Sequence, residues 1–306
     1  MKPHDVLAIG TCYVDTNLPA YPFDNTGIPS GVELVGEQYE VVAGGSAVNF
    51  CRLLCGFGLK PAFLGMAGDD SNGASLEAAL QSDGIEPFII KETGLLTNIS
   101  FNMTNASGEH IMLVAGTANA ALAPEPVLAQ LKSKANNIKM VYLGGCFKLK
   151  KLAPAFTDMA AVAQQADAVV VVDHGRIPQA ASPEIVACVK ELVLKANYYL
   201  PSRDEFCQLW EVESIEDGLA MLHDQAPETI TVVKDGANGA YYWDEHGVKH
   251  IEAPRVDKVI NATGAGDSFN AGLVAAVTHG HELADAVHFG CLVGAAKVSG
   301  NTIPSL

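Results

Sequence analysis

Residues 259–276 read VINATGAGDSFNAGLVAA and place a single carboxylate, Asp267, directly after the small residues Gly264, Ala265 and Gly266. An apolar run with helical spacing follows, so this stretch is typical of a sharp turn into a helix. Free N–H groups at such a helix start favour an anion, and small residues let it approach closely. Asp267 then has two interpretations, which this stretch alone leaves equally open. It is either a general base for a group attacking that anion, or a helix-terminal residue that complements the helix dipole.

Working outward, apolar runs alternate along the chain with amphipathic helical patterns. The runs read as buried strands of a parallel sheet covered on both faces, at 6–10, 62–68, 139–145, 168–173, 197–200 and 229–234. Helices are predicted at 71–82, 125–134, 150–165, 183–194 and 214–224. This rhythm predicts a doubly wound α/β domain, and a turn near Gly247 predicts a hairpin at the edge of its sheet.

Two segments, 11–42 and 96–117, depart from this alternation. Each alternates in hydrophobicity like a strand that is half exposed to solvent, so we expect them to pair into a small β-sheet that projects as a lid. The main domain then comprises 1–10, 43–95 and 118–306. Candidates for an apolar lid face, which needs a partner and is one route to a homodimer, are Val32, Leu34, Val41, Ile99, Phe101, Met103, Ile111 and Leu113.

The overall composition excludes several classes of protein. The chain has 306 residues, a formal net charge of −16 and no block of basic residues, which argues against nucleic acid or an anionic membrane as a partner. No apolar run is long enough to span a bilayer, and the N-terminus reads as a first strand. Seven scattered cysteines without a C-x-x-C pair indicate free thiols in a reducing compartment, so we expect a cytoplasmic protein.

A second glycine-rich turn lies at 41–54, VVAGGSAVNFCRLL. Gly44 and Gly45 precede Ser46, which has the chemistry of a helix N-cap, and Asn49 falls in the first helical turn. Bare backbone amides and one amide side chain are suited to holding hydroxyl groups. A pair of glycines before a helix is, by itself, more often structural than functional.

Together these two turns resemble the signature regions of the PfkB, or ribokinase, family of carbohydrate kinases. The family pattern G-G-x-x-x-N is present as Gly44, Gly45 and Asn49, and D-T-x-G-A-G-D is present as NATGAGD, ending at Asp267. The stretches FLGMAGDDSNG at 63–73 and VVKDGANGAYY at 232–242 also resemble family motifs. The resemblance covers nearly the whole chain, and it implies a ribokinase-like fold with the small sheet as its lid.

The resemblance implies that Mg·ATP donates a phosphoryl group to a hydroxyl of a small carbohydrate, with Asp267 as the general base. The helix start would form the anion hole through Gly264, Ala265 and Gly266. Substrate-binding residues implied in the same way are Asp15, Asn17, Gly44, Gly45 and Asn49. Nucleotide-binding residues are Lys234, Gly236 and Gly239.

The chain departs from the family pattern at the cation sites. Asn261 replaces the first aspartate of the second signature, so with Thr263 it forms a weakened candidate site for a monovalent ion such as K⁺. The N-x-x-E pattern near the phosphates appears as Ser202 and Glu205, and Glu205 is expected to act on Mg²⁺ through water. Cys291 replaces an asparagine often found near the adenine.

Several alternatives stay open at this stage. A nucleoside kinase of the same family is the nearest one. A phosphosugar kinase needs fixed cations, for which Lys148, Lys150 and Lys151 are candidates because arginines are few. A binding protein that has lost catalysis is a third, against which the intact GAGD stretch argues. Asp173 and Arg176, at the end of a predicted strand, fit either a role near the phosphates or a loop salt bridge. The P-loop pattern G-x-x-x-x-G-K-[ST] is absent.

Overall fold

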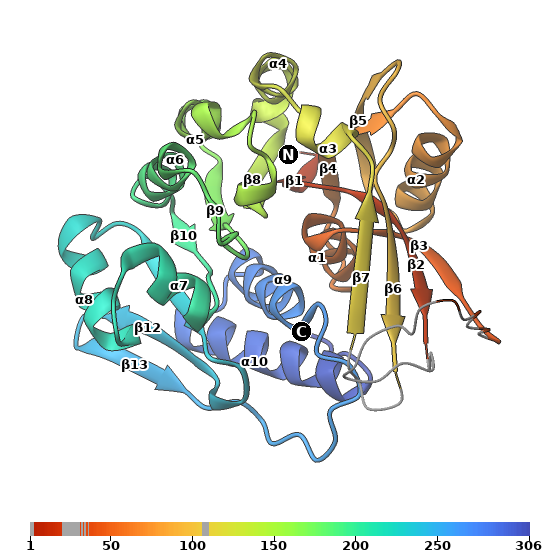
Figure 1. Ribbon diagram of the computed structural model, residues 1–306. Coiled ribbons are helices and arrows are strands. Elements are labelled where there is room, and N and C mark those ends of the chain that lie inside the picture. The colour runs from red at the N-terminus through yellow and green to blue at the C-terminus, as the bar shows by residue number, and fades with distance from the viewer. Residues whose placement is uncertain (1–2, 20–30, 32, 34, 36, 106–109) are drawn as a thin grey trace.

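The protein is described by a computed structural model that covers residues 3–19, 31, 33, 35, 37–105 and 110–306. Its main sheet has nine strands in the order β13-β12-β11-β10-β9-β8-β1-β4-β5 (Figure 1). The pairs from β5 through β11 are parallel, and β12 and β13 extend the sheet as an antiparallel hairpin. The bounds are β1 (His4–Ile9), β4 (Pro61–Gly68), β5 (Glu86–Glu92), β8 (Ile138–Gly144), β9 (Val169–Asp173), β10 (Tyr198–Tyr199), β11 (Ile230–Lys234), β12 (Ala240–Asp244) and β13 (Gly247–Ile251).

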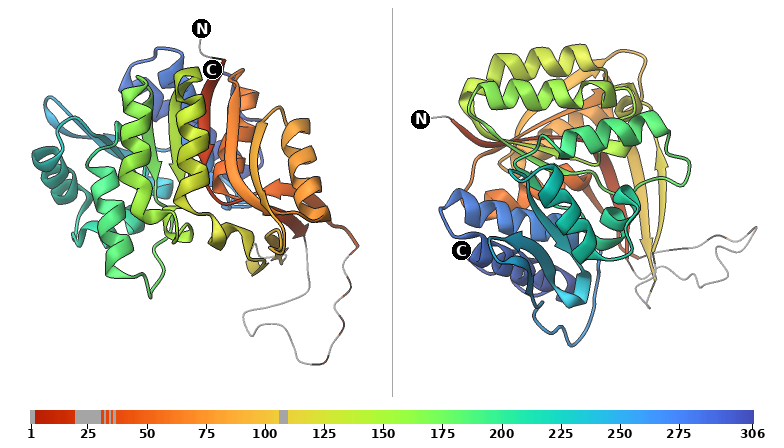
Figure 2. Two further views of the ribbon diagram at one scale, coloured as in Figure 1. Left: turned by 90° about the horizontal axis from the view of Figure 1, so that it is seen from above. Right: turned by 90° about the vertical axis from the view of Figure 1, so that its left-hand side faces the viewer.

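Helices cover both faces of this sheet (Figure 2). One face carries α1 (Ser46–Gly56), α2 (Ser71–Ser82), α9 (Ala265–Thr278) and α10 (Leu283–Ser299). The other carries α3 (Ala118–Ala121), α4 (Pro124–Lys134), α5 (Phe156–Gln165), α6 (Pro183–Val193), α7 (Arg203–Trp210) and α8 (Ile215–Gln225). Short 3₁₀ turns are η1 (Ala135–Asn137), η2 (Cys146–Lys148), η3 (Ala153–Ala155) and η4 (Gly236–Asn238).

Two apolar cores, one on each face, explain why the central strands are continuously apolar. In β1, Val6 and Ala8 pack into the core beneath α1 and α9, and Leu7 and Ile9 pack into the core beneath α4 and α5. Since successive strand residues point to opposite faces, both sets must be hydrophobic. The predicted doubly wound class is therefore confirmed.

A separate four-stranded sheet, which we call the lid, has the order β3-β2-β6-β7. Its strands are β2 (Tyr13–Leu18), β3 (Glu40–Gly44), β6 (Ile99–Thr104) and β7 (His110–Ala115). They come from the two segments in which a small sheet was predicted. The strand β3 continues to Gly44, beyond the predicted boundary at residue 42, because Gly44 pairs with Tyr13. Val32 and Leu34 lie outside the described residues.

Other differences from the predicted elements have local causes. Strand β5 was not predicted, because it is an edge strand with charged ends and a half-exposed middle. The helix predicted at 150–165 begins at Phe156, after a 3₁₀ turn that contains Pro154. Asp70 is the N-cap of α2, since its side chain accepts from the Gly73 N–H. The cysteines all carry free thiols, as predicted. Among the described residues, no helix is both long and apolar enough to cross a membrane.

Candidate active site

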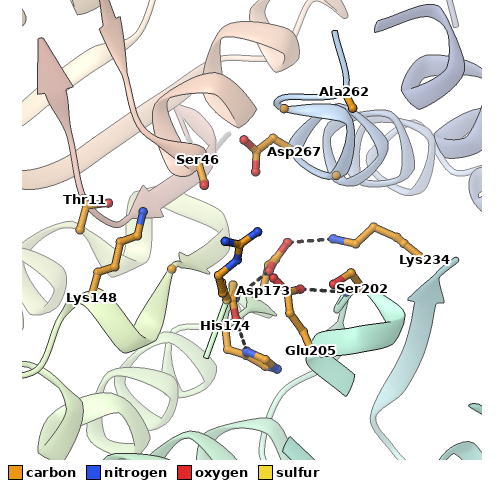
Figure 3. Close-up of a pocket in the computed structure, with 15 residues that line it drawn as sticks. Thr11, Ser46, Lys148, Asp173, His174, Ser202, Glu205, Lys234, Ala262 and Asp267 are labelled. Carbon is orange, nitrogen blue, oxygen red and sulfur yellow. Dashed lines mark hydrogen bonds and ion pairs between the residues drawn. The ribbon is translucent and has the colours of Figure 1, made fainter. Parts of the chain in front are cut away.

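A cavity of about 400 Å³ opens at the carboxyl ends of the central strands, beside the start of α9 (Figure 3). This edge of a parallel sheet is the usual binding site of doubly wound folds. Asp267 projects into the cavity from α9, Asp173 and Lys234 come from the ends of β9 and β11, and Lys148 lies on the opposite wall. The lining also includes Thr11, Ser46, Gly145, His174, Gly175, Arg176, Ser202, Glu205, Ala262, Gly264 and Gly266.

The start of α9 has the form of an anion-binding turn. Gly264 is the N-cap residue and has a left-handed backbone conformation, with φ = 79°. As a glycine, it has no side chain that could cap the helix. The first N–H groups of a helix have no intrahelical acceptor. Of these, the Ala265 N–H donates to the Ala262 carbonyl at 3.2 Å. The Ala265 N–H, which was predicted to line the anion hole, is therefore engaged within the turn. The N–H groups of Gly266 and Asp267 are the better placed donors for a ligand.

The half-buried carboxyl of Asp267 is electrostatically unusual. Burial, followed by the negative charge of Asp173, raises its pKa to about 7. The ammonium groups of Lys234 and Lys148 and a hydrogen bond from the Asn49 side chain act in the opposite direction. A carboxyl with a pKa near neutrality is suited to take up a proton at physiological pH.

Asp173 is held as a carboxylate by a buried polar network behind the cavity. The Lys234 Nζ donates to Asp173 Oδ2 at 2.9 Å and to Asn270 Oδ1 at 3.0 Å, and the Asn270 amide also donates to Asp173. Burial alone would raise the pKa of Asp173, but Lys234 outweighs it and the pKa is lowered. Asp173 is therefore in a buried ion pair rather than in an exposed loop salt bridge.

His174, the residue after Asp173, has a structural environment. Its Nε2 lies 2.8 Å from the Tyr199 hydroxyl and its Nδ1 lies 2.6 Å from the Gly175 carbonyl. Burial lowers the pKa of the imidazole, which favours the neutral form. We assign it to the support of the strand ends rather than to catalysis.

The lid presents a polar face built from two adjacent strands. Asp15 pairs with Ser100 and Asn17 pairs with Asn102 across β2 and β6. The Ser100 hydroxyl donates to Asp15 at 2.6 Å, and the Asn102 amide donates to Asn17 Oδ1 at 3.1 Å. Burial raises the pKa of Asp15, while Ser100, Arg52 and the cavity residue Lys148 lower it. Asp15 thus lies within electrostatic reach of the cavity.

Both glycines of the turn at 44–45 are required by close contacts. A Cβ on Gly44 would lie 1.7 Å from Asp15 Oδ2, so the carboxylate occupies the space that a side chain would fill. Gly45 has φ = 109°, and a Cβ there would lie 2.4 Å from the Thr11 carbonyl oxygen. Gly44 therefore makes room for the Asp15 carboxylate, and its predicted part in substrate binding stays a prediction.

The predicted nucleotide-side glycines lie beyond the residues that line this cavity. Gly236 and Gly239 flank the turn η4 between β11 and β12, and a Cβ on Gly239 would lie 2.0 Å from the Ile251 carbonyl oxygen. That contact gives Gly239 a packing role. Their role in nucleotide binding stays a prediction.

The candidate cation residues lie in the first turn of α7 and in the loop before α9. Glu205 lines the cavity, but its Oε2 accepts from the Ser202 N–H at 3.0 Å in a capping box at the start of α7. Asn261 is exposed, and its Oδ1 accepts from the Thr263 N–H at 2.8 Å. Among the described residues there is no cluster of three or more acidic, His or Cys side chains that could enclose a metal ion. The donor set fits Mg²⁺ held mainly by nucleotide phosphates, with one carboxylate at a distance.

Several site residues were not predicted. Asn270, Ser100 and Asn102 carry no local motif, and they join the site through pairings between distant segments. Arg52 contacts Asn49 within α1, but its anchoring by Asp83 also joins distant segments. The sequence contains a weak indication of the ion pair between Asp173 and Lys234, because both residues end predicted strands of one parallel sheet.

Comparisons with known proteins show which family the chain resembles in sequence and fold. The family model described as "pfkB family carbohydrate kinase" matches residues 3–302. The chain is 25% identical to a ribokinase of Haemophilus influenzae, over 88% of this chain and 85% of the relative. It is 24% identical to a 5-dehydro-2-deoxygluconokinase of Halalkalibacterium halodurans, over 97% and 89%. Its fold matches a solved Arabidopsis thaliana ribokinase complexed with ribose and ATP, with a TM-score of 0.78 and 18% identity over 100% and 95% of the chains.

Proposed function

This chain belongs to the pfkB family of carbohydrate kinases, and we propose that within the family it is a sugar kinase in which Asp267 acts as the general base. It is an ATP-dependent phosphotransferase. Its relatives include both sugar kinases and a nucleoside kinase, so it is a sugar or nucleoside kinase. The proposal that Asp267 is the general base rests on its position at the N-terminus of α9 and on its raised pKa of about 7.

The proposed step is an in-line displacement. The acceptor hydroxyl oxygen attacks the γ-phosphorus of ATP, its proton passes to Asp267, and the bond between the γ-phosphorus and the bridging oxygen breaks to release ADP. The N–H groups of Gly266 and Asp267 donate to the oxygens of the transferred group. Mg²⁺, when bound with ATP, would neutralise phosphate charge, with Glu205 as its water-mediated contact.

Lys234 would stabilise the transferred phosphoryl group. A Cβ on Gly266 would lie 3.6 Å from the Lys234 Nζ, so the ammonium lies beside the anion hole. A buried cation there attracts the transferred phosphoryl group, and its ion pair with Asp173 holds it in place.

The acceptor would bind between the lid and α9. Asp15, Asn17 and Asn49 offer both hydrogen-bond donors and acceptors, which is the pattern that a polyhydroxylated ligand requires. The lid would then exclude water during transfer, since water competes with the acceptor for the phosphoryl group.

A sugar acid is a second candidate acceptor, favoured by the position of Lys148. Its Nζ lies 5.6 Å from the centre of the Tyr13 ring, and among the described residues no carboxylate lies within ion-pair distance of it. An acidic acceptor would neutralise this cation. One relative is a 5-dehydro-2-deoxygluconokinase, whose name denotes a sugar acid as its acceptor.

The test is ADP formation from ATP with a panel of acceptors. The panel should contain ribose, fructose, 5-dehydro-2-deoxygluconate, aminoimidazole riboside, adenosine and fructose 1-phosphate. Saturable turnover with a sugar or sugar acid, well above turnover with nucleosides, supports the proposal. Turnover confined to a nucleoside or to a phosphosugar contradicts it.

A further inference from the structure

Arg52 is a charged residue in the interior of α1 that the proposed reaction does not use. Its Nε and Nη2 lie 2.9 and 2.8 Å from Asp83 Oδ2, which anchors the guanidinium. Nη2 donates to the Ala43 carbonyl at 2.6 Å, just before the glycine turn. Nη1 donates to Asn49 Oδ1 at 3.1 Å, one helical turn earlier on α1. The guanidinium therefore joins α1, the end of α2 and strand β3 at one point.

The contact with Asn49 determines which way its amide points. A guanidinium is only a donor, so the atom of Asn49 that faces Arg52 must be the carbonyl oxygen. The NH₂ group of Asn49 is then directed away from Arg52, and the Asn49 side chain makes a hydrogen bond to Asp267. A reversed amide would set its NH₂ against the guanidinium and its oxygen against the Asp267 carboxylate, and both contacts are repulsive.

We propose that Arg52 is a positioning residue for the kinase reaction: it fixes the Asn49 amide so that a donor faces Asp267 and the acceptor hydroxyl. This inference rests on the proposed role of Asp267. Arg52 acts through Asn49 and touches neither substrate. Asp83, at the end of α2, supports this arrangement because it holds the guanidinium of Arg52 in place.

The charge of Asp267 depends on groups from every element around it. Asp173 on β9 opposes its ionisation, and Lys234 on β11, Lys148 in η2 and the Asn49 donor on α1 favour it. Arg176, after β9, also lines the cavity. Of these groups, only the Asn49 donor depends on Arg52. Loss of Arg52 should therefore weaken one of the interactions that favour the ionised form.

The experiment measures the pKa of Asp267 directly in the ligand-free protein. Aspartate is labelled with ¹³C at the carboxyl carbon, and its NMR signal is assigned by its disappearance in Asp267→Asn. Arg52→Met should raise the pKa of Asp267 by roughly half a pH unit or more, because the Asn49 donor is no longer oriented. Asn49→Ala should raise it by at least as much. Arg255→Met, which removes an exposed arginine paired with Asp257 in its own loop, should leave it unchanged.

The double variant separates positioning from through-space charge. If Arg52 acts through Asn49, Arg52→Met should add little to the shift in the Asn49→Ala background. An unchanged pKa in Arg52→Met would overturn the proposal. So would a full additional shift in the double variant, since that would make Arg52 an independent charge.

If Arg52→Met does not fold, Asp83→Asn provides the same test with the guanidinium present but no longer held by a carboxylate. It should raise the pKa of Asp267 by a smaller amount, and not at all in the Asn49→Ala background. No shift in either background would count against the proposal. With an acceptor found by the panel, Arg52→Met should also raise the KM for that acceptor while the KM for ATP stays within about twofold. The NMR measurement needs no substrate, so its outcome is independent of whether the acceptor proposal holds.

Discussion

At the scale of single residues, the site has two carboxyls that compete for one buried ammonium. Asp173 has Lys234 at 2.9 Å and the Asn270 amide, so it stays ionised. Asp267 lies near the same negative charge without a direct cation, and its pKa rises to about 7. Pairs of acids with pKa values driven apart in this way are a common feature of proton-transfer sites.

Asp267→Asn should make the protein more stable at pH 8. The pKa of Asp267 is about 7 in the folded protein against an ordinary value of 3.8. Between these values the folded protein keeps a proton that the unfolded chain has released, so this group's contribution to stability falls as pH rises. The gain in unfolding free energy should be up to about 4 kcal/mol at pH 8, which is the value set by the difference between these two pKa values, and should shrink toward pH 4. Urea unfolding at several pH values measures it, and a gain independent of pH would speak against the raised pKa.

Gly44→Ala should weaken acceptor binding by tenfold or more, because its Cβ would lie 1.7 Å from Asp15 Oδ2 and displace the carboxylate. The matched control is Gly56→Ala at the end of α1, where a Cβ meets nothing within 4 Å. Steady-state kinetics on both variants provide the measurement. An acceptor KM in Gly44→Ala equal to that of the control would remove Asp15 from the acceptor site.

At the scale of elements, the turn from 259 to the start of α9 combines the anion site with the candidate monovalent cation loop. The Ile260 and Asn261 N–H groups both donate to the Val298 carbonyl near the end of α10, at 2.8 and 3.3 Å. The Asn261 side chain already accepts from Thr263 within the loop. An amide oxygen that is engaged in this way is a weak ligand for an ion.

We therefore expect replacement of Na⁺ by K⁺ at constant ionic strength to change kcat by less than about threefold. Asn261→Asp should increase the response, because it restores a charged oxygen ligand. Initial rates over a K⁺ titration test both statements. Strong, saturable activation of the unaltered protein would show that the amide is sufficient.

At the scale of the whole molecule, the lid leaves a mainly apolar row on the face opposite Asp15. Val41, Thr16, Phe101 and Leu113 are neighbours across all four strands. Phe101 is 41% exposed, and Val41 and Leu113 are each 53% exposed. A small sheet with one uncovered apolar face gains stability from a second layer. We expect two lids to supply that layer for each other.

Light scattering at micromolar concentration should give a dimer mass, and Phe101→Glu should give a monomer. The control is Met112→Glu, a similarly exposed residue on the other face of β7, which should stay dimeric. A monomer mass for the unaltered protein would refute the lid dimer.

The sequence predicted the parts of this molecule that depend on local patterns. The strand–helix alternation, the small sheet, the free thiols and the turn before Asp267 all follow from residue spacing and were found. Edge strand β5 was missed because its hydrophobic middle is short. Contacts that depend on tertiary register, such as Arg52 with Asp83 or Lys234 with Asn270, could not be predicted since no local pattern encodes which strands and helices become neighbours.

The central claim is that Asp267 removes the acceptor proton, and the most direct measurement compares turnover with ATP binding in Asp267→Asn. Asparagine keeps the size of the side chain but cannot accept the proton, so kcat should fall by about 10²–10⁴-fold. The Kd for ATP, measured by calorimetry, should stay within a few-fold, because the α9 amides and Lys234 are unchanged. Turnover within a few-fold of the unaltered protein would contradict the claim and leave Asp267 as a helix-terminal residue.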